Sequence, residues 1–205
     1  MTATELLAVD IVLLPPAEVS RRAIAASRRL ASALRLGPGR LPHLTLAMAC
    51  IESDALPAVA ALLRAIASRR PALEITLEGT IGVPGPAHVS VWYAARRTRA
   101  LMALHRDCMK ALSPHRRKRV PAAAFAAAPG EPVSPSALRW VRRFEEEAAF
   151  ERYRPHITLG YGRPGPDSAF PSTFPGRRLA LCHLGNHCTC VRILTEARLA
   201  ASGVN

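Results

Sequence analysis

The chain has 205 residues, of which 49% are hydrophobic and 5% aromatic, and its 28 Lys and Arg against 15 Asp and Glu give a formal net charge of +13. This length is enough for one large domain with a mostly aliphatic core. No apolar run of about 18 residues occurs, which argues against a transmembrane helix, and the first residues lack the basic region of a secretory signal. We therefore expect a cytoplasmic protein with no membrane partner.

The positive charge has two interpretations. A surplus of Arg and Lys of this size favours polyanionic partners such as RNA or nucleotides. Alternatively, it reflects the Arg and Ala enrichment of a GC-rich genome, in which arginine replaces lysine on solvated surfaces. The charge alone does not decide between them.

The chain is predicted to begin with a buried strand and an amphipathic helix. Residues 6–14 form an apolar run that ends at two prolines, as expected for a buried strand. Asp10 interrupts this run, and it is either a paired, buried carboxylate or a residue at an exposed edge. Apolar positions at helical spacing over 17–36 predict the helix. The Gly/Pro loop 37–39 then leads to the next strand.

That strand carries a motif that occurs twice, first as Pro42-His43-Leu44-Thr45-Leu46 and later as Pro155-His156-Ile157-Thr158-Leu159. Residues two apart in a strand point to the same face, so each His shares a face with its Thr and the aliphatic residues share the other. A single copy would more often be ordinary packing. Two copies suggest two similar units packed about a pseudo-two-fold axis, with their polar faces together.

Such a meeting of polar faces would place two imidazoles and two hydroxyls around one cleft. An unperturbed histidine titrates at about pH 6.5, so one ring is suited to act as a general base and the other as a general acid. The hydroxyls are donors for an anion. This combination of groups suits hydrolysis or transfer at a phosphodiester without a metal or another cofactor.

The middle of the chain predicts a helix at 54–68, an alternating strand at 73–78, a turn region at 79–87 and a second strand at 88–93. Trp92 shares a strand face with the polar residues of this second strand. It is interpreted either as a platform for a nucleobase or as ordinary strand packing.

The second half predicts helices at 97–112 and 136–150, with a long basic and Pro/Ala-rich loop at 113–135 beside the cleft. The basic run 115–119 in this loop either contacts a polyanion or is simply solvated. The second motif strand ends at Tyr161. Pro/Gly-rich sequence at 163–176 and a terminal hairpin of strands 178–183 and 188–195 follow.

The five cysteines are expected to be reduced thiols, because their number is odd and no export signal is present. Cys182, Cys188 and Cys190 cluster with two histidines, but their spacing matches no common zinc pattern and alternating strand side chains would not converge on one ion. We therefore expect no metal site. Helices mixed with largely antiparallel strands indicate an α+β fold, and residues 1–205 are read as one domain of two intertwined lobes.

The doubled motif, together with an N-terminal aliphatic strand ending in Leu-Pro-Pro, resembles the 2H phosphoesterase superfamily. The most similar branch is the LigT-like, 2′-5′ RNA ligase or cyclic phosphodiesterase branch. This resemblance implies a bilobal, pseudo-symmetric α+β fold in which two largely antiparallel sheets line a central cleft, with helices outside. It also implies metal-independent hydrolysis of 2′,3′-cyclic phosphates of RNA ends or nucleotides, usually to a 2′-phosphate, and in some relatives 2′-5′ RNA ligase activity.

Carried onto this chain, the resemblance makes His43, Thr45, His156 and Thr158 the catalytic residues. We assign His156 as the base and His43 as the acid, while the two threonines hold the non-bridging phosphate oxygens. Trp92, Tyr161 and Arg154 are expected to bind substrate, and the protein is expected to be a monomer. The distance between the motifs and the long loop depart from the pattern of the family.

Two alternatives stay open. The chain could act on another phosphate, such as 2′-5′ oligoadenylate, ADP-ribose cyclic phosphate or an RNA 3′ tail. It could also be a non-catalytic module that only binds nucleotide or RNA, although both His and both Thr are present. The physiological substrate does not follow from the sequence.

Overall fold

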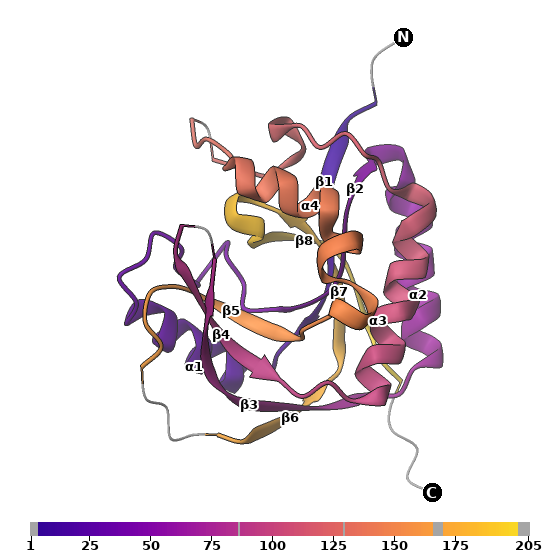
Figure 1. Cartoon of the computed structure of the whole chain (residues 1–205). Helices are drawn as coiled ribbons and strands as arrows, with labels where there is room; N and C mark the ends of the chain where they lie inside the picture. Colours follow the sequence, from indigo (N-terminus) through magenta and orange to yellow (C-terminus); the bar gives the residue numbers. More distant parts are fainter. Residues whose placement is uncertain (1–3, 86, 129, 166–169, 201–205) are drawn as a thin grey trace, which may run out of the picture.

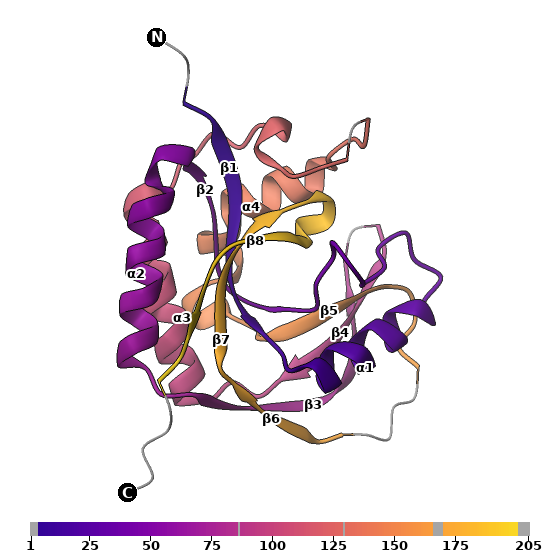
Figure 2. The ribbon, with the colours of Figure 1, turned by 180° about the vertical axis from the view of Figure 1, so that it is seen from behind.

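The structure is a computed structural model that describes residues 4–85, 87–128, 130–165 and 170–200. In this part of the chain, eight strands form one sheet in the order β6-β3-β4-β5-β2-β1-β7-β8, and every neighbouring pair of strands is antiparallel. Four α-helices pack against the sheet, which curls around as Figures 1 and 2 show. This arrangement is an α+β fold, as the sequence predicts.

The strands are β1 (Leu6–Leu14), β2 (Leu44–Glu52), β3 (Leu73–Pro84), β4 (Val89–Ala95), β5 (His156–Tyr161), β6 (Ser172–Gly176), β7 (Arg178–Leu184) and β8 (Cys190–Arg198). The helices are α1 (Ala17–Arg28), α2 (Leu56–Arg69), α3 (Arg99–Leu112) and α4 (Pro135–Ala148). Two short 3₁₀ turns also matter for the site, η4 (Phe150–Arg152) and η5 (Asn186–Cys188).

The two motif strands, β2 and β5, lie side by side at the centre of the sheet, with four strands in each half. One cross-strand pair, Leu44 with Ile157, joins the halves. The prediction of two sheets is therefore wrong, because the motif strands are paired edge to edge and make the two halves one continuous sheet.

The helices bury the apolar face of the sheet. α1 packs on β5, whereas α2 and α3 lie side by side and cover β2, β7 and β8 (Figures 1 and 2). α4 packs on β2 and on η5. The core between them is mainly aliphatic, as the composition predicts. None of the helices in the described ranges is long and apolar enough to cross a membrane.

Helix α1 ends at Arg28, eight residues earlier than its apolar periodicity predicts. Two buried serine side chains explain the early end. The Ser27 hydroxyl accepts a hydrogen bond from the Leu36 amide (3.0 Å), and the Ser32 hydroxyl accepts hydrogen bonds from the amides of Leu34 and Tyr161 (3.1 Å each). These bonds compete with helical ones and hold the segment after α1 in a non-helical path against β5.

Two strand predictions need correction. The predicted turn at 79–87 is mostly strand, because β3 continues to Pro84 and pairs with β4 along this length. Part of the Pro/Gly-rich segment 163–176 forms β6, an edge strand paired with β3; residues 166–169 of that segment lie outside the described residues. An edge position tolerates Pro175, since only one side of the strand must donate hydrogen bonds.

The cysteine prediction was also wrong in part. Cys182 on β7 and Cys190 on β8 form a disulfide, whereas Cys50, Cys108 and Cys188 are free thiols. The antiparallel hairpin brings the two bonded cysteines together across neighbouring strands, with 5.6 Å between their Cα atoms. An odd number of cysteines does not reveal that two of them lie this close in the fold.

Candidate active site

Both motif strands are irregular immediately after their threonine. On β2, Val12 pairs with Thr45 and Ile11 with Ala47, so Leu46 has no partner residue. On β5, Trp92 pairs with Thr158 and Val91 with Gly160, so Leu159 has none. The final leucine of each motif is therefore a β-bulge, which reverses the alternation of side chains along its strand.

These bulges decide which residues reach the polar face of the sheet. Without the bulge in β2, Thr45 would lie on the opposite face from Asp10; with it, the two share a face. Without the bulge in β5, Tyr161 would face the core; with it, Tyr161 joins Thr158 and Trp92. The repeated motif thus provides both the His/Thr pair and the local kink that brings further side chains to that pair.

The four motif side chains stand on one face of the joined strands. Leu44 and Ile157 lie opposite each other and point to the same face of the sheet. The residues before and after each of them therefore point to the opposite face. His43, Thr45, His156 and Thr158 are all partly exposed, whereas the alternating aliphatic residues of both motifs are buried. The polar and apolar faces expected from the sequence are therefore present, and the two halves bring the polar ones together.

Each catalytic candidate histidine is oriented in the same way. The Nδ1 atom of His43 lies 2.7 Å from the carbonyl of Leu41, and Nδ1 of His156 lies 2.6 Å from the carbonyl of Arg154. A carbonyl only accepts hydrogen bonds, so Nδ1 carries the proton in both rings. The Nε2 atom of each neutral ring then has a lone pair available for proton transfer.

The two half-sites differ in what lies next to the motif. Beside His156, the Trp92 indole stacks on the imidazole with ring centroids 3.6 Å apart, and the guanidinium of Arg154 lies 5.2 Å from the indole centroid. Beside His43, the buried carboxyl of Asp10 accepts a hydrogen bond from Thr45 (2.6 Å) and lies 3.8 Å from His43 Nε2. The site is therefore doubled in its motif but asymmetric in its surroundings.

The surroundings also change the protonation of both rings. Burial, together with the nearby His43 ring, lowers the pKa of His156 to about 4, against the opposing effect of its bond to the Arg154 carbonyl. Burial also lowers the pKa of His43. The electrostatic effect of His43 on His156 agrees with their place on one face of the joined strands. At neutral pH, the His156 ring is therefore unprotonated.

Buried aromatic groups brace the bulge in β2 from the core side. The Tyr153 hydroxyl donates to the Thr45 carbonyl (2.7 Å), and His105 Nδ1 donates to the Leu46 carbonyl (2.6 Å). The rings of Tyr153 and His105 stack with centroids 4.0 Å apart, and His105 Nε2 accepts from the Phe150 amide (2.8 Å). The carbonyls at the bulge are thus satisfied by side chains from α3 and from the residue after η4.

The expected substrate-binding residues lie around this face. Trp92 packs against His156, and its indole nitrogen donates to the Ser90 hydroxyl (2.7 Å). Tyr161 lies against the ring of His88 (3.6 Å between centroids), and its hydroxyl is 3.2 Å from Nδ1 of His187 in η5. Tyr161 therefore links the two halves of the sheet at one end of the motif strands. Base stacking by Trp92 stays a prediction.

A cavity of about 550 Å³ adjoins the His156 side of the site. Trp92, Ala94, Arg154 and Pro155 line it together with residues of α4 and η4. Trp92 therefore forms a wall shared by the cavity and the His156 ring, and the exposed Arg154 adds a positive charge at the same place.

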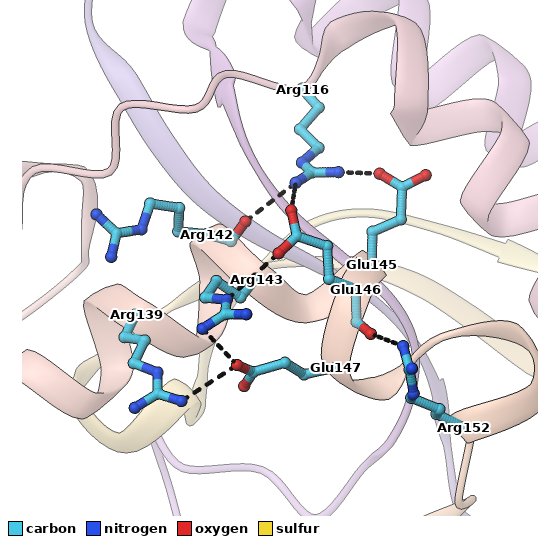
Figure 3. A network of polar contacts seen from close by, with 8 residues as sticks. All are labelled: Arg116, Arg139, Arg142, Arg143, Glu145, Glu146, Glu147 and Arg152. Carbon is cyan, nitrogen blue, oxygen red and sulfur yellow. Dashed lines mark hydrogen bonds and ion pairs between the residues drawn. The ribbon is translucent and has the colours of Figure 1, made fainter.

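The basic run 115–119 serves partly to hold the chain together. Arg116 bonds the carboxylate of Glu145, pairs with Glu146 and donates to the Arg142 carbonyl (Figure 3). Arg117 binds Glu52 at the end of β2 through two hydrogen bonds of 2.9 and 3.0 Å. These two arginines tie the loop to α4 and β2, so the run is less available to a polyanion than its charge suggests.

Asp10 lies next to the first motif, although the sequence assigned it no part in the site. Its signal is a carboxyl in the middle of an apolar strand, and of the two interpretations, a paired and buried carboxylate or an exposed edge residue, burial holds: Asp10 has no exposed surface and is bonded to Thr45. In the part of the chain that the structure describes, no group of three or more His, Cys, Asp or Glu side chains is arranged to hold a metal ion. His183 and His187 bind Ala124 and Tyr161 instead.

Comparisons with known proteins agree with this fold. The protein TT0787 of Thermus thermophilus superposes with a TM-score of 0.60 at 16% identity, covering 96% of this chain and 100% of that one. E. coli LigT complexed with NADP⁺ gives 0.58 at 16% identity over 96% and 99% of the chains, and a phosphoesterase gives 0.56 at 19% over 95% and 99%.

A search of curated protein sequences finds no match. The sequence model of the 2′-5′ RNA ligase superfamily, however, matches residues 15–175. This span contains both motif strands, most of the sheet and all four helices, so the chain belongs to the 2′-5′ RNA ligase superfamily.

Proposed function

We propose that this protein is a metal-independent phosphodiesterase that opens 2′,3′-cyclic phosphates at RNA ends or on nucleotides, giving a 2′-phosphate. One observation carries the proposal. Both imidazoles have Nδ1 bound to a backbone carbonyl, which leaves each Nε2 for proton transfer, and both stand on one face with the two threonines. Family membership and solved structures of E. coli LigT with 3′-AMP and ATP support a nucleotide substrate.

In this reaction His156 is the base, since its low pKa keeps Nε2 unprotonated at neutral pH. It takes a proton from water as the water oxygen bonds to phosphorus. The bond from phosphorus to the 3′ oxygen breaks, and His43 gives the proton from its Nε2 to that oxygen. The bound phosphate anion favours the protonated form of His43. Hydroxyl donors from Thr45 and Thr158 stabilise the charge that grows on the non-bridging oxygens.

The cavity beside Trp92 is the place we assign to the nucleoside. It opens next to His156, it is large enough for a nucleobase and ribose, and it offers Arg154 for the negative charges of a following phosphate. In this arrangement Trp92 forms the wall between the nucleoside and His156.

The test is a substrate panel in the presence of EDTA. It includes the four 2′,3′-cyclic nucleotides, an oligoribonucleotide with a cyclic phosphate end, 2′-5′ oligoadenylate and ADP-ribose cyclic phosphate, with the position of the product phosphate read by ³¹P NMR. We expect turnover of the cyclic phosphates and a fall of at least about 1,000-fold in His43→Ala and His156→Ala. Binding without turnover across the whole panel would support the non-catalytic alternative instead.

A further inference from the structure

Asp10 lies in the middle of β1, with no exposed surface, between β2 and β7. One oxygen of its carboxyl, Oδ2, accepts the hydrogen bond from Thr45 and approaches His43 Nε2. The other oxygen, Oδ1, has no hydrogen-bond partner among the described residues. A carboxyl so placed is an integral part of the candidate site, yet neither motif contains it.

If Asp10 is ionised, Thr45 has no hydroxyl proton left to donate to a substrate. A threonine hydroxyl has one proton to donate. A carboxylate at 2.6 Å only accepts, so it would take that proton and leave none for a phosphate oxygen. A protonated carboxyl reverses the bond: Asp10 donates to Thr45 Oγ1, and the hydroxyl proton of Thr45 turns toward the substrate.

The environment of Asp10 favours this neutral form. Among the described residues, the titratable groups that approach it or interact with it electrostatically include His43 immediately before β2, Tyr153 after η4, Cys108 on α3 and Cys188 in η5. None of these four is a fixed cation, and burial raises the pKa of Asp10 well above its ordinary value, despite the opposing hydrogen bond from Thr45. An ionised carboxylate here would also repel the phosphate anion that the site is proposed to bind.

We propose that Asp10 is a positioning residue that stays neutral: its carboxyl O–H donates a hydrogen bond to Thr45 Oγ1, which directs the threonine hydroxyl proton to a non-bridging phosphate oxygen. This role rests on the proposed function of the site. The second half-site has no such acid, because the residue at the position that corresponds to Asp10 is Ser90, whose hydroxyl binds the Trp92 indole.

Two substitutions at the same position separate the neutral donor from a carboxylate. Asp10→Asn keeps an N–H donor on a side chain of the same shape, whereas Asp10→Leu keeps the branching of the side chain, is bulkier and has no donor. We expect kcat/KM on a 2′,3′-cyclic nucleotide to fall by no more than about 3-fold in Asp10→Asn and by about 100-fold in Asp10→Leu, the effect of losing one anion donor. The loss should be in kcat more than in KM, because the donor is strongest where charge develops.

The effect should pass through the threonine. In a Thr45→Val background, Asp10→Leu should change kcat/KM by less than about 3-fold, since the hydroxyl it orients is absent. Full additivity of the two changes would contradict the proposal. A loss of about 100-fold in Asp10→Asn would also overturn it, because that result requires a carboxylate that pairs with His43. Thermal unfolding of each variant shows whether a lower kcat/KM comes from a loss of folded protein.

A spectroscopic measurement decides the protonation state even if no cyclic phosphate is turned over. Both the wild-type protein and Asp10→Asn are labelled with ¹³C-aspartate, and the infrared spectrum of the variant is subtracted from that of the wild type. The difference should contain the C=O stretch of a protonated carboxyl at neutral pH. A carboxylate band in its place would refute the proposal. Failure of the wild-type protein on the whole substrate panel, with the protonated band present, would instead count against the proposed function alone.

Discussion

The indole of Trp92 on β4 stacks on the imidazole of His156 on β5, with 3.6 Å between ring centroids and 10° between planes. This contact contributes to the burial that lowers the pKa of His156 to about 4. Trp92 is therefore a partner of the proposed base as well as a wall of the adjoining cavity.

Trp92→Ala should raise the pKa of His156 toward the ordinary histidine value, because water would reach the ring and stabilise its charged form. The proposed base is active when unprotonated, so the acidic limb of the pH profile of kcat/KM should move to higher pH. Long-range ¹H–¹⁵N NMR of the His156 ring measures the same shift without turnover. Trp92→Phe keeps a stacked ring and serves as the control; an unchanged titration of His156 in the alanine variant would exclude this effect.

Tyr153→Phe should destabilise the protein by about 1–3 kcal/mol, because it removes the hydroxyl of a buried residue that binds the Thr45 carbonyl at the bulge. Urea denaturation measures the change. Tyr161→Phe is a matched control, since the hydroxyl of that half-buried residue makes a longer bond, to His187, and its loss should cost less. Equal costs for the two variants would mean that the bond at the bulge has no special weight.

Gly160→Ala should lower the free energy of unfolding by about 1–3 kcal/mol. Gly160 has a φ of +149°, and a Cβ there would lie 3.1 Å from the Leu34 carbonyl and 3.2 Å from the Ser32 hydroxyl. Gly162→Ala is the control, because its φ of +135° is similar but the nearest atom would be 3.9 Å away. A larger loss at position 162 would show that backbone conformation, and not crowding, dominates. The strain at Gly160 should also lower kcat/KM, since Thr158 precedes it by two residues.

Arg116→Met should lower the melting temperature, and added salt should reduce the difference from wild type, because the lost interactions are the ion pairs with Glu145 and Glu146. Its affinity for a single-stranded oligoribonucleotide should fall no further than that of Arg119→Met. Arg119 is exposed in the same run and forms no ion pair within the described residues. A selective loss of RNA affinity in Arg116→Met would show that the run contacts the polyanion directly.

The sequence predicted the strands that carry the motifs, their polar and apolar faces and most helices, because these follow from local periodicity and from a pattern present twice. The membership of Asp10 in the site was not predictable in the same way. It depends on a shift of register between β1 and β2, which only the pairing of distant strands reveals. The early end of α1 likewise depends on Ser32 bonding to Tyr161, 129 residues away.

The unpaired leucine in each motif strand has a consequence for judging relatives of this protein by alignment. Removing one residue at position 46 or 159 would leave a histidine and threonine still spaced by two, so a search for the short pattern would score the altered chain as intact. In space, however, the strand would lose its bulge, and Thr45 would face away from Asp10 or Thr158 away from Tyr161. A match to the pattern therefore supports a shared activity only when the motif strand also keeps its one-residue β-bulge against the neighbouring strand.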